Sequence, residues 1–104
     1  MLRIYDLILD TIRILRPSFE RIERKDADLG RQMRRAASSI ALNVSEGSYS
    51  RGGNRQVRYH SALGSARETL ACLEVAAVLG YAGDVTPEMH SRFSEILGTL
   101  RKVV

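Results

Sequence analysis

Arginine is the side chain with the greatest capacity for specific chemistry in this chain, because fourteen of its sixteen basic residues are arginines. Guanidinium groups form paired hydrogen bonds with carboxylates and with phosphates. The segment from residue 31 to residue 58 has one acidic residue, Glu46, and six arginines: Arg31, Arg34, Arg35, Arg51, Arg55 and Arg58. This segment predicts either a surface that binds the phosphates of RNA or DNA, or a set of ion pairs between helices and subunits.

The other reactive side chains form no pattern typical of an active site. His60 and His90 are thirty residues apart, and neither has a cysteine or carboxylate at the spacing of metal ligands. The serines lack the strand-turn-helix context of a nucleophile, and the glycines at 47, 52 and 53 lack the Gly-Lys-Ser/Thr ending of a phosphate-binding loop. Without a base, a nucleophile and an orienting group, we expect no enzyme activity, no metal and no cofactor.

The length of 104 residues predicts a single domain, residues 1–104, with one modest core. Residues 1–60 hold twelve of the sixteen basic residues and seven of the twelve acidic ones, so the basic excess is local. No apolar run is long enough to span a bilayer, and the N-terminus lacks the hydrophobic region of a signal peptide. We therefore expect a cytoplasmic protein without a membrane partner, in which the lone Cys72 is a buried, reduced thiol.

Apolar residues recur at three- and four-residue steps and predict four helices. The first spans about residues 2–24, and Pro17 should kink or divide it; the continuity of the apolar stripe favours a kink. The second begins near Asp26 or Asp28, and Gly47 should end it as a left-handed terminator. The third runs from a cap at Asn54 to residue 79, and the fourth starts at 86–88, a Thr-Pro-Glu sequence. Short links between these helices predict an all-α, antiparallel, up-down-up-down four-helix bundle.

Two of these helices carry apolar residues outside their main stripes. Leu42 lies on the polar back face of the second helix, where it could be an ordinary exposed leucine or part of a subunit contact. The third helix is apolar on two faces and should be buried on both, and Gly64 in its interior suggests the close approach of another backbone. Glu46 and Glu68 should meet arginines, with Arg34, Arg35 and Arg67 as the nearest candidates, or else be plain solvated side chains. The predicted subunit interface therefore comprises Leu42, Glu46, Gly64, Glu68, Ala71 and Val75.

Four short motifs between residues 25 and 81 carry a family resemblance. They are Gln32–Ala36, Ser39-Ile40 with Asn43–Gly47, Ala62–Ser65 with Glu68, and Leu79-Gly80-Tyr81. In this combination the chain resembles the bacterial four-helix-bundle proteins named for intervening sequences in large-subunit (23S) ribosomal RNA genes. It departs from their pattern at Val44-Ser45, where Ile-Ala is common, and in the glycine-rich link 50–53.

The resemblance implies that antiparallel bundles assemble into a ring, expected to be a homopentamer, without catalytic activity. Related accessory proteins of diversity-generating retroelements look like the same barrel of bundles and work with a reverse transcriptase and nucleic acid. Two hypotheses follow: a ring that binds nucleic acid through its arginines, which the basic excess favours slightly, and a scaffold for a protein partner such as a nucleic-acid enzyme. A head-to-tail ring contact uses two different faces, as the residues around Leu42 and Val75 require.

Overall fold

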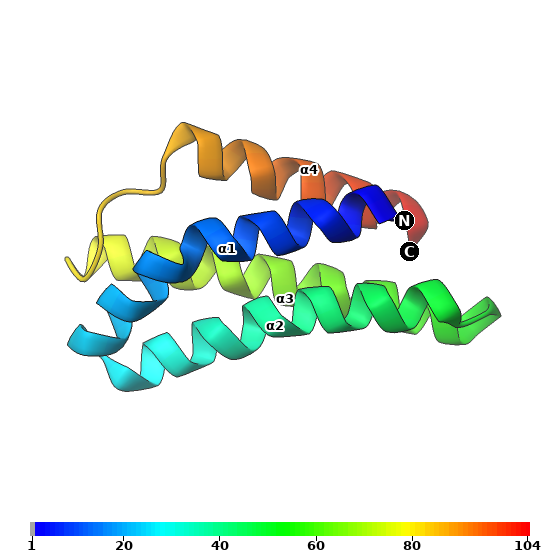
Figure 1. Ribbon diagram of the computed structural model, residues 1–104, viewed down its shortest axis with the longest axis horizontal. Helices are drawn as coiled ribbons and strands as arrows, with labels where there is room; N and C mark the ends of the chain where they lie inside the picture. Colours follow the sequence, from blue (N-terminus) through cyan, green and yellow to red (C-terminus); the bar gives the residue numbers. More distant parts are fainter. Residues whose placement is uncertain (1) are drawn as a thin grey trace.

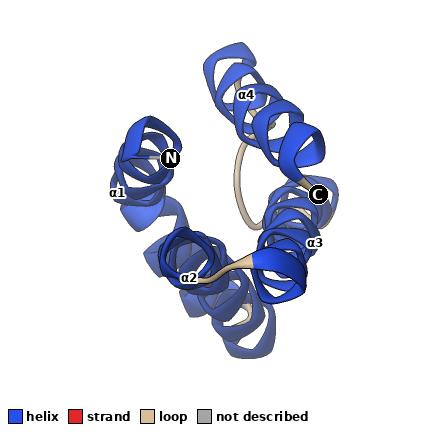
Figure 2. Ribbon diagram, turned by 90° about the vertical axis from the view of Figure 1, so that its right-hand side faces the viewer, coloured by secondary structure: helices blue, strands red, loops and turns tan. Residues whose placement is uncertain are grey.

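The computed structural model describes residues 2–104, which form four helices with short connections (Figure 1). The helices are α1 (Leu2–Lys25), α2 (Ala27–Tyr49), α3 (Gly52–Val78) and α4 (Pro87–Val103). Successive helices run in opposite directions, and each packs along the next (Figures 1 and 2). The contact between α1 and α4 is less extensive than the contact between α2 and α3. The predicted antiparallel up-down-up-down bundle is confirmed, and residues 2–104 contain no strand.

All four helices contribute to one core, which the predicted apolar stripes identify correctly. The side chains with almost no exposed surface include Ile8, Phe19 and Ile22 of α1, Met33 and Val44 of α2, and Phe93, Ile96 and Leu100 of α4. Helix α3 supplies smaller residues such as Ala62, Ala66 and Ala76. Burying each large apolar side chain contributes about 1.5 to 3 kcal/mol, so this shared core holds the helices that present the candidate site.

Local signals fix several helix ends where the sequence predicts them. The side chain of Asp26 accepts a hydrogen bond of 3.0 Å from the backbone N–H of Leu29, so Asp26 is the N-cap of α2. Thr86 accepts the same kind of bond from Met89 at 3.1 Å and caps α4. Gly80 follows α3 with φ of 78°, a left-handed conformation that glycine adopts without strain. Helix α1 continues through Pro17, so the chain is not divided there.

The predicted end of α2 at Gly47 is wrong, because α2 continues to Tyr49 and Gly47 lacks a positive φ. Gly47 is buried against α3, where a Cβ atom would lie 2.4 Å from Cε1 of Tyr59. The glycine therefore permits close packing of two helices and does not terminate one. The predicted cap at Asn54 is also wrong, since α3 starts at Gly52, whose φ is 57°.

Cys72 is buried in the core, as predicted, and forms no disulfide. Burial raises the pKa of its thiol, and the nearby carboxylate of Glu68 adds to this shift. None of the four helices combines the length and the apolar character needed to cross a membrane.

Candidate nucleic-acid interface

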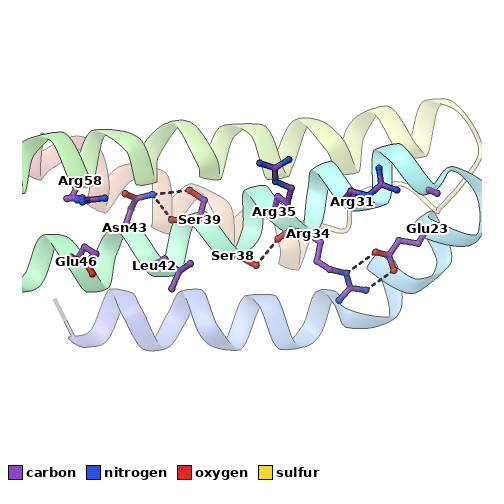
Figure 3. Close-up of a pocket in the computed structure, with 11 residues that line it drawn as sticks. Glu23, Arg31, Arg34, Arg35, Ser38, Ser39, Leu42, Asn43, Glu46 and Arg58 are labelled. Carbon is purple, nitrogen blue, oxygen red and sulfur yellow. Dashed lines mark hydrogen bonds and ion pairs between the residues drawn. The ribbon is translucent and has the colours of Figure 1, made fainter.

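A groove of about 590 Å³ runs over the outer face of α2, and we call it the α2 groove (Figure 3). Glu23 of α1 and Arg58 of α3 lie at its borders. From α2 it receives Arg31, Arg34 and Arg35 of the predicted phosphate-binding set, and Leu42 and Glu46 of the predicted subunit interface. Members of the two sets, which the sequence predicts as separate surfaces, therefore line one groove.

Arg34 joins α2 to α1 through Glu23, a pairing that the sequence does not predict. Its Nε and Nη2 atoms donate hydrogen bonds of 2.9 and 2.8 Å to the two oxygens of Glu23 (Figure 3). The hydrogen bonding lowers the pKa of Glu23 and raises that of Arg34. The guanidinium group also lies 5.1 Å from the ring centroid of Phe19. Arg34 thus holds α2 against α1, and Glu23 neutralises its charge.

The other five predicted phosphate-binding arginines differ in whether their guanidinium groups already bond to other groups of the chain. Arg31 donates to Asp28 at 2.9 Å in an exposed ion pair. Arg55 donates from Nε to the backbone oxygens of Gly47 and Ser50, which lie at the end of α2. Within residues 2–104, the exposed side chains of Arg35, Arg51 and Arg58 have no hydrogen-bond or ion-pair partner. These last three retain their full capacity to bind an external anion.

The motif residues between α2 and α3 form a polar seam beside the groove. The amide nitrogen of Asn43 donates to the backbone and hydroxyl oxygens of Ser39, both at 2.9 Å. The hydroxyls of Ser39 and Ser65 lie 2.8 Å apart and join α2 to α3. Glu68 accepts a hydrogen bond of 3.2 Å from Gln32. The Ser39–Ser65 and Gln32–Glu68 bonds therefore join α2 to α3, and all four residues belong to the motifs noted in the sequence.

The expected pairing of Glu46 and Glu68 with arginines is not formed within the chain. The ion pairs found among residues 2–104 involve neither glutamate, and Arg34 pairs with Glu23 instead. Both glutamates are exposed, as are Ala71 and Val75 of α3. The expected close backbone approach at Gly64 is also missing within the chain, since a Cβ there would meet nothing within 4 Å.

One exposed apolar residue of α3, Val57, extends the predicted subunit interface. Leu42 is 66% exposed in the α2 groove, and Val75 is 45% exposed on α3. Val57 lies on the same side of α3 as Gly64 and Val75, because seven and eighteen residues are close to whole numbers of helical turns. Val57 is 64% exposed, and the helical period could have identified it. The surface role of this set stays a prediction.

No three histidine, cysteine or acidic side chains gather at metal-binding distance in the described part of the chain. His60 and His90 are exposed residues on α3 and α4. The α2 groove offers guanidinium groups, two carboxylates (Glu23 and Glu46), two serine hydroxyls, the amide of Asn43 and one leucine. Guanidinium groups beside an exposed leucine suit the binding of anions and of protein surfaces.

Comparison with known proteins places the whole bundle in one group. The model of the family described as "23S rRNA-intervening sequence protein" matches residues 3–102, which include nearly all of the four helices. No curated protein and no solved structure gives a significant match.

Proposed function

This chain belongs to the 23S rRNA-intervening sequence protein family, and we propose that it is a non-enzymatic, homo-oligomeric protein that binds RNA or DNA through its arginines. The resemblance described above makes a pentameric ring the expected assembly. Phosphates of the polynucleotide backbone would be the groups recognised, without selection among bases.

The observation that carries this proposal is the presence of arginines without a compensating carboxylate. Arg35, Arg51 and Arg58 have no acidic partner among residues 2–104, whereas Arg31 and Arg34 do. No aspartate or glutamate occurs from residue 47 to residue 67, a stretch with four arginines. Such a surface attracts polyanions and exchanges small counterions for phosphates on binding.

Exposed apolar side chains on two helices support self-association. Leu42 on α2, Val75 and Val78 on α3, and Leu79 directly after α3 are all between 45% and 86% exposed in a single chain. These residues lie on different helices, so a head-to-tail contact between copies would cover both sets at once. In such an assembly Arg31 and Arg34, which pair with acidic residues of the chain, would lie near the subunit contact. The phosphates would bind Arg35, Arg51 and Arg58.

Salt-dependent binding tests the proposal. We expect a fluorescein-labelled RNA or DNA oligonucleotide to bind by fluorescence anisotropy, with an affinity that falls steeply as salt rises. Replacing Arg35, Arg51 and Arg58 together by glutamate should weaken binding at least about tenfold, because several phosphate contacts become repulsive. Arg55 is left unchanged because it bonds the end of α2.

A matched variant controls for net charge in this test. Arg16, Arg24 and Arg101 are exposed, lie outside the 31–58 segment and have no ion-pair partner among residues 2–104. Their joint replacement by glutamate changes the net charge equally and should have a much smaller effect. Equal loss in both triple variants, or an affinity indifferent to salt, would count against the proposal.

The alternative function is a scaffold for a protein partner, and one observation favours it. Leu42 lies in the same groove as Arg31 and Arg34, whose charges Asp28 and Glu23 already compensate. A surface of this kind, apolar at its centre and with ion pairs beside it, suits a protein interface. Recovery of a stoichiometric protein partner that survives nuclease treatment, together with no oligonucleotide binding, would support this alternative.

A further inference from the structure

The end of the α2–α3 hairpin projects beyond the other two helices. In Figure 1 the green segment that joins α2 to α3 extends along the long axis past both chain termini. We call residues 49–55 of this segment the α2–α3 tip. Its position leaves it accessible to a large ligand without any rearrangement of the bundle.

Among residues 2–104, the tip carries the one aromatic side chain that is largely exposed. Tyr49 is 89% exposed. The other five aromatic side chains are inside or packed against the core: Phe19, Phe93 and Tyr59 are buried, and Tyr5 and Tyr81 are partly buried. An exposed tyrosine ring costs free energy in water and is available to stack on a planar ligand.

Hydrogen bonds hold the backbone beside Tyr49 in place. The N–H and hydroxyl groups of Ser50 donate to the backbone oxygens of Gly47 and Glu46, at 3.2 and 2.8 Å. Arg55 bonds the oxygens of Gly47 and Ser50 from the α3 side, at 3.2 and 2.9 Å. An ordered backbone lowers the entropy lost on binding.

The α2–α3 tip that carries Tyr49 also carries two arginines and no acidic residue. Arg51 is exposed and has no ion-pair partner within residues 2–104, and Arg55 uses only its Nε atom in the bonds described above. The nearest acidic residue in sequence before the tip is Glu46, and after it Glu68. An exposed ring followed within six residues by two arginines provides the groups that a nucleobase and its neighbouring phosphates require.

We propose that the α2–α3 tip binds an unpaired nucleotide, with the ring of Tyr49 stacked on the base and Arg51 and Arg55 bonded to the flanking phosphates. This inference rests on the proposed nucleic-acid binding and narrows its ligand to single-stranded segments, loops or ends. In an intact duplex the neighbouring base pairs cover both faces of each base, so the ring has no surface on which to stack. One tyrosine stacks on any base, so no sequence selection follows.

A tryptophan reporter tests the stacking directly, because the chain contains no tryptophan of its own. Tyr49→Trp should lose fluorescence when a single-stranded oligonucleotide binds. His90→Trp, on an exposed position of α4, is the matched control and should not respond. An oligomer of the same length made of abasic sites should bind the Tyr49→Trp variant without this loss. Saturated binding of the base-containing strand without a fluorescence change overturns the inference.

Affinities of single strands and duplexes of equal length provide the second test, with RNA and DNA measured in parallel. Tyr49→Ala should weaken single-strand binding by about tenfold and affect duplex binding little, whereas Tyr49→Phe should retain wild-type affinity. If the wild type binds single strands and Tyr49→Ala binds them equally well, the tip inference fails and the proposed function stands. If the wild type binds no polynucleotide at low salt, the proposed function itself fails.

Discussion

Gly47 of α2 lies directly against the ring of Tyr59 on α3, so that a Cβ atom on Gly47 would be 2.4 Å from Cε1 and 2.7 Å from Cδ1 of the tyrosine. Both residues are buried, and the ring leaves no room for a larger side chain. This contact brings α2 and α3 together just before the α2–α3 tip. The close approach of α2 and α3 before the tip therefore depends on a glycine in the last turn of α2.

Gly47→Ala should destabilise the fold by about 1 to 3 kcal/mol, because the added methyl group overpacks the contact with Tyr59. Urea unfolding followed by circular dichroism measures the change. Gly98→Ala is the control, since Gly98 lies within α4 and a Cβ there meets nothing within 4 Å. That variant should gain up to about 1 kcal/mol from helix propensity. An unchanged or raised stability of Gly47→Ala would contradict the packing described here.

The contrast between Gly47 and the helix caps shows which parts of the fold the sequence could predict. Asp26 and Thr86 each bond a backbone N–H three residues later, so the signal and its effect lie within one turn. The apolar stripes likewise identify the core. Gly47 is of a residue type that often ends helices, but here it allows close contact with Tyr59. That contact depends on how two helices pack, which the local sequence does not show.

The candidate site was less predictable for the same reason. Arg34 pairs with Glu23 on another helix, and the Ser39–Ser65 bond joins residues twenty-six positions apart. The arginine cluster itself was visible in the sequence. The sequence does not show which of these arginines already have a hydrogen-bond or ion-pair partner. That depends on the rotation of each helix about its axis, which the apolar period determines only within broad limits.

Glu23 and Arg34 predict a specific dependence of stability on pH. The hydrogen bonds from Arg34 lower the pKa of Glu23 in the folded state, so the contribution of the pair is complete above the ordinary pKa of a glutamate. It is lost as the pH falls through the lowered, folded-state pKa.

The variant Glu23→Gln isolates this pair. It should be less stable than the wild type at neutral pH, and the difference should shrink as the pH is lowered well below about 4. Urea unfolding at several pH values measures it. A difference that stays constant over this range, or grows in acid, would show that the pair is not the cause.

Gly64 offers a test of the subunit surface. In a single chain Gly64→Ala meets no neighbour, so it should stabilise the helix by up to about 1 kcal/mol, as Gly98→Ala does. If another copy packs closely on this face, the same methyl group should weaken the assembly. Analytical ultracentrifugation of both variants across a concentration series should show weaker association for Gly64→Ala alone. Identical association of the two variants would show that Gly64 does not lie in a subunit contact.

Cys72 should react slowly with thiol reagents in the folded protein. Its side chain is 4% exposed, and burial raises the pKa of the thiol, so little of the reactive thiolate is present or accessible. Labelling followed with a chromogenic disulfide should accelerate strongly when urea unfolds the chain. Rapid labelling of the native protein would show that α3 opens locally around Cys72.

Native mass measurement of the purified chain, before and after nuclease treatment, tests the central claim of a homo-oligomer that binds polynucleotides. We expect a mass that is a multiple of the 11.6 kDa chain, five copies being the expected number, with nucleic acid bound at low salt. Nuclease or high salt should remove the nucleic acid and leave the protein assembly intact, whereas Leu42→Asp should dissociate it. A particle of 11.6 kDa at micromolar concentration, free of nucleic acid at low salt, would contradict the claim.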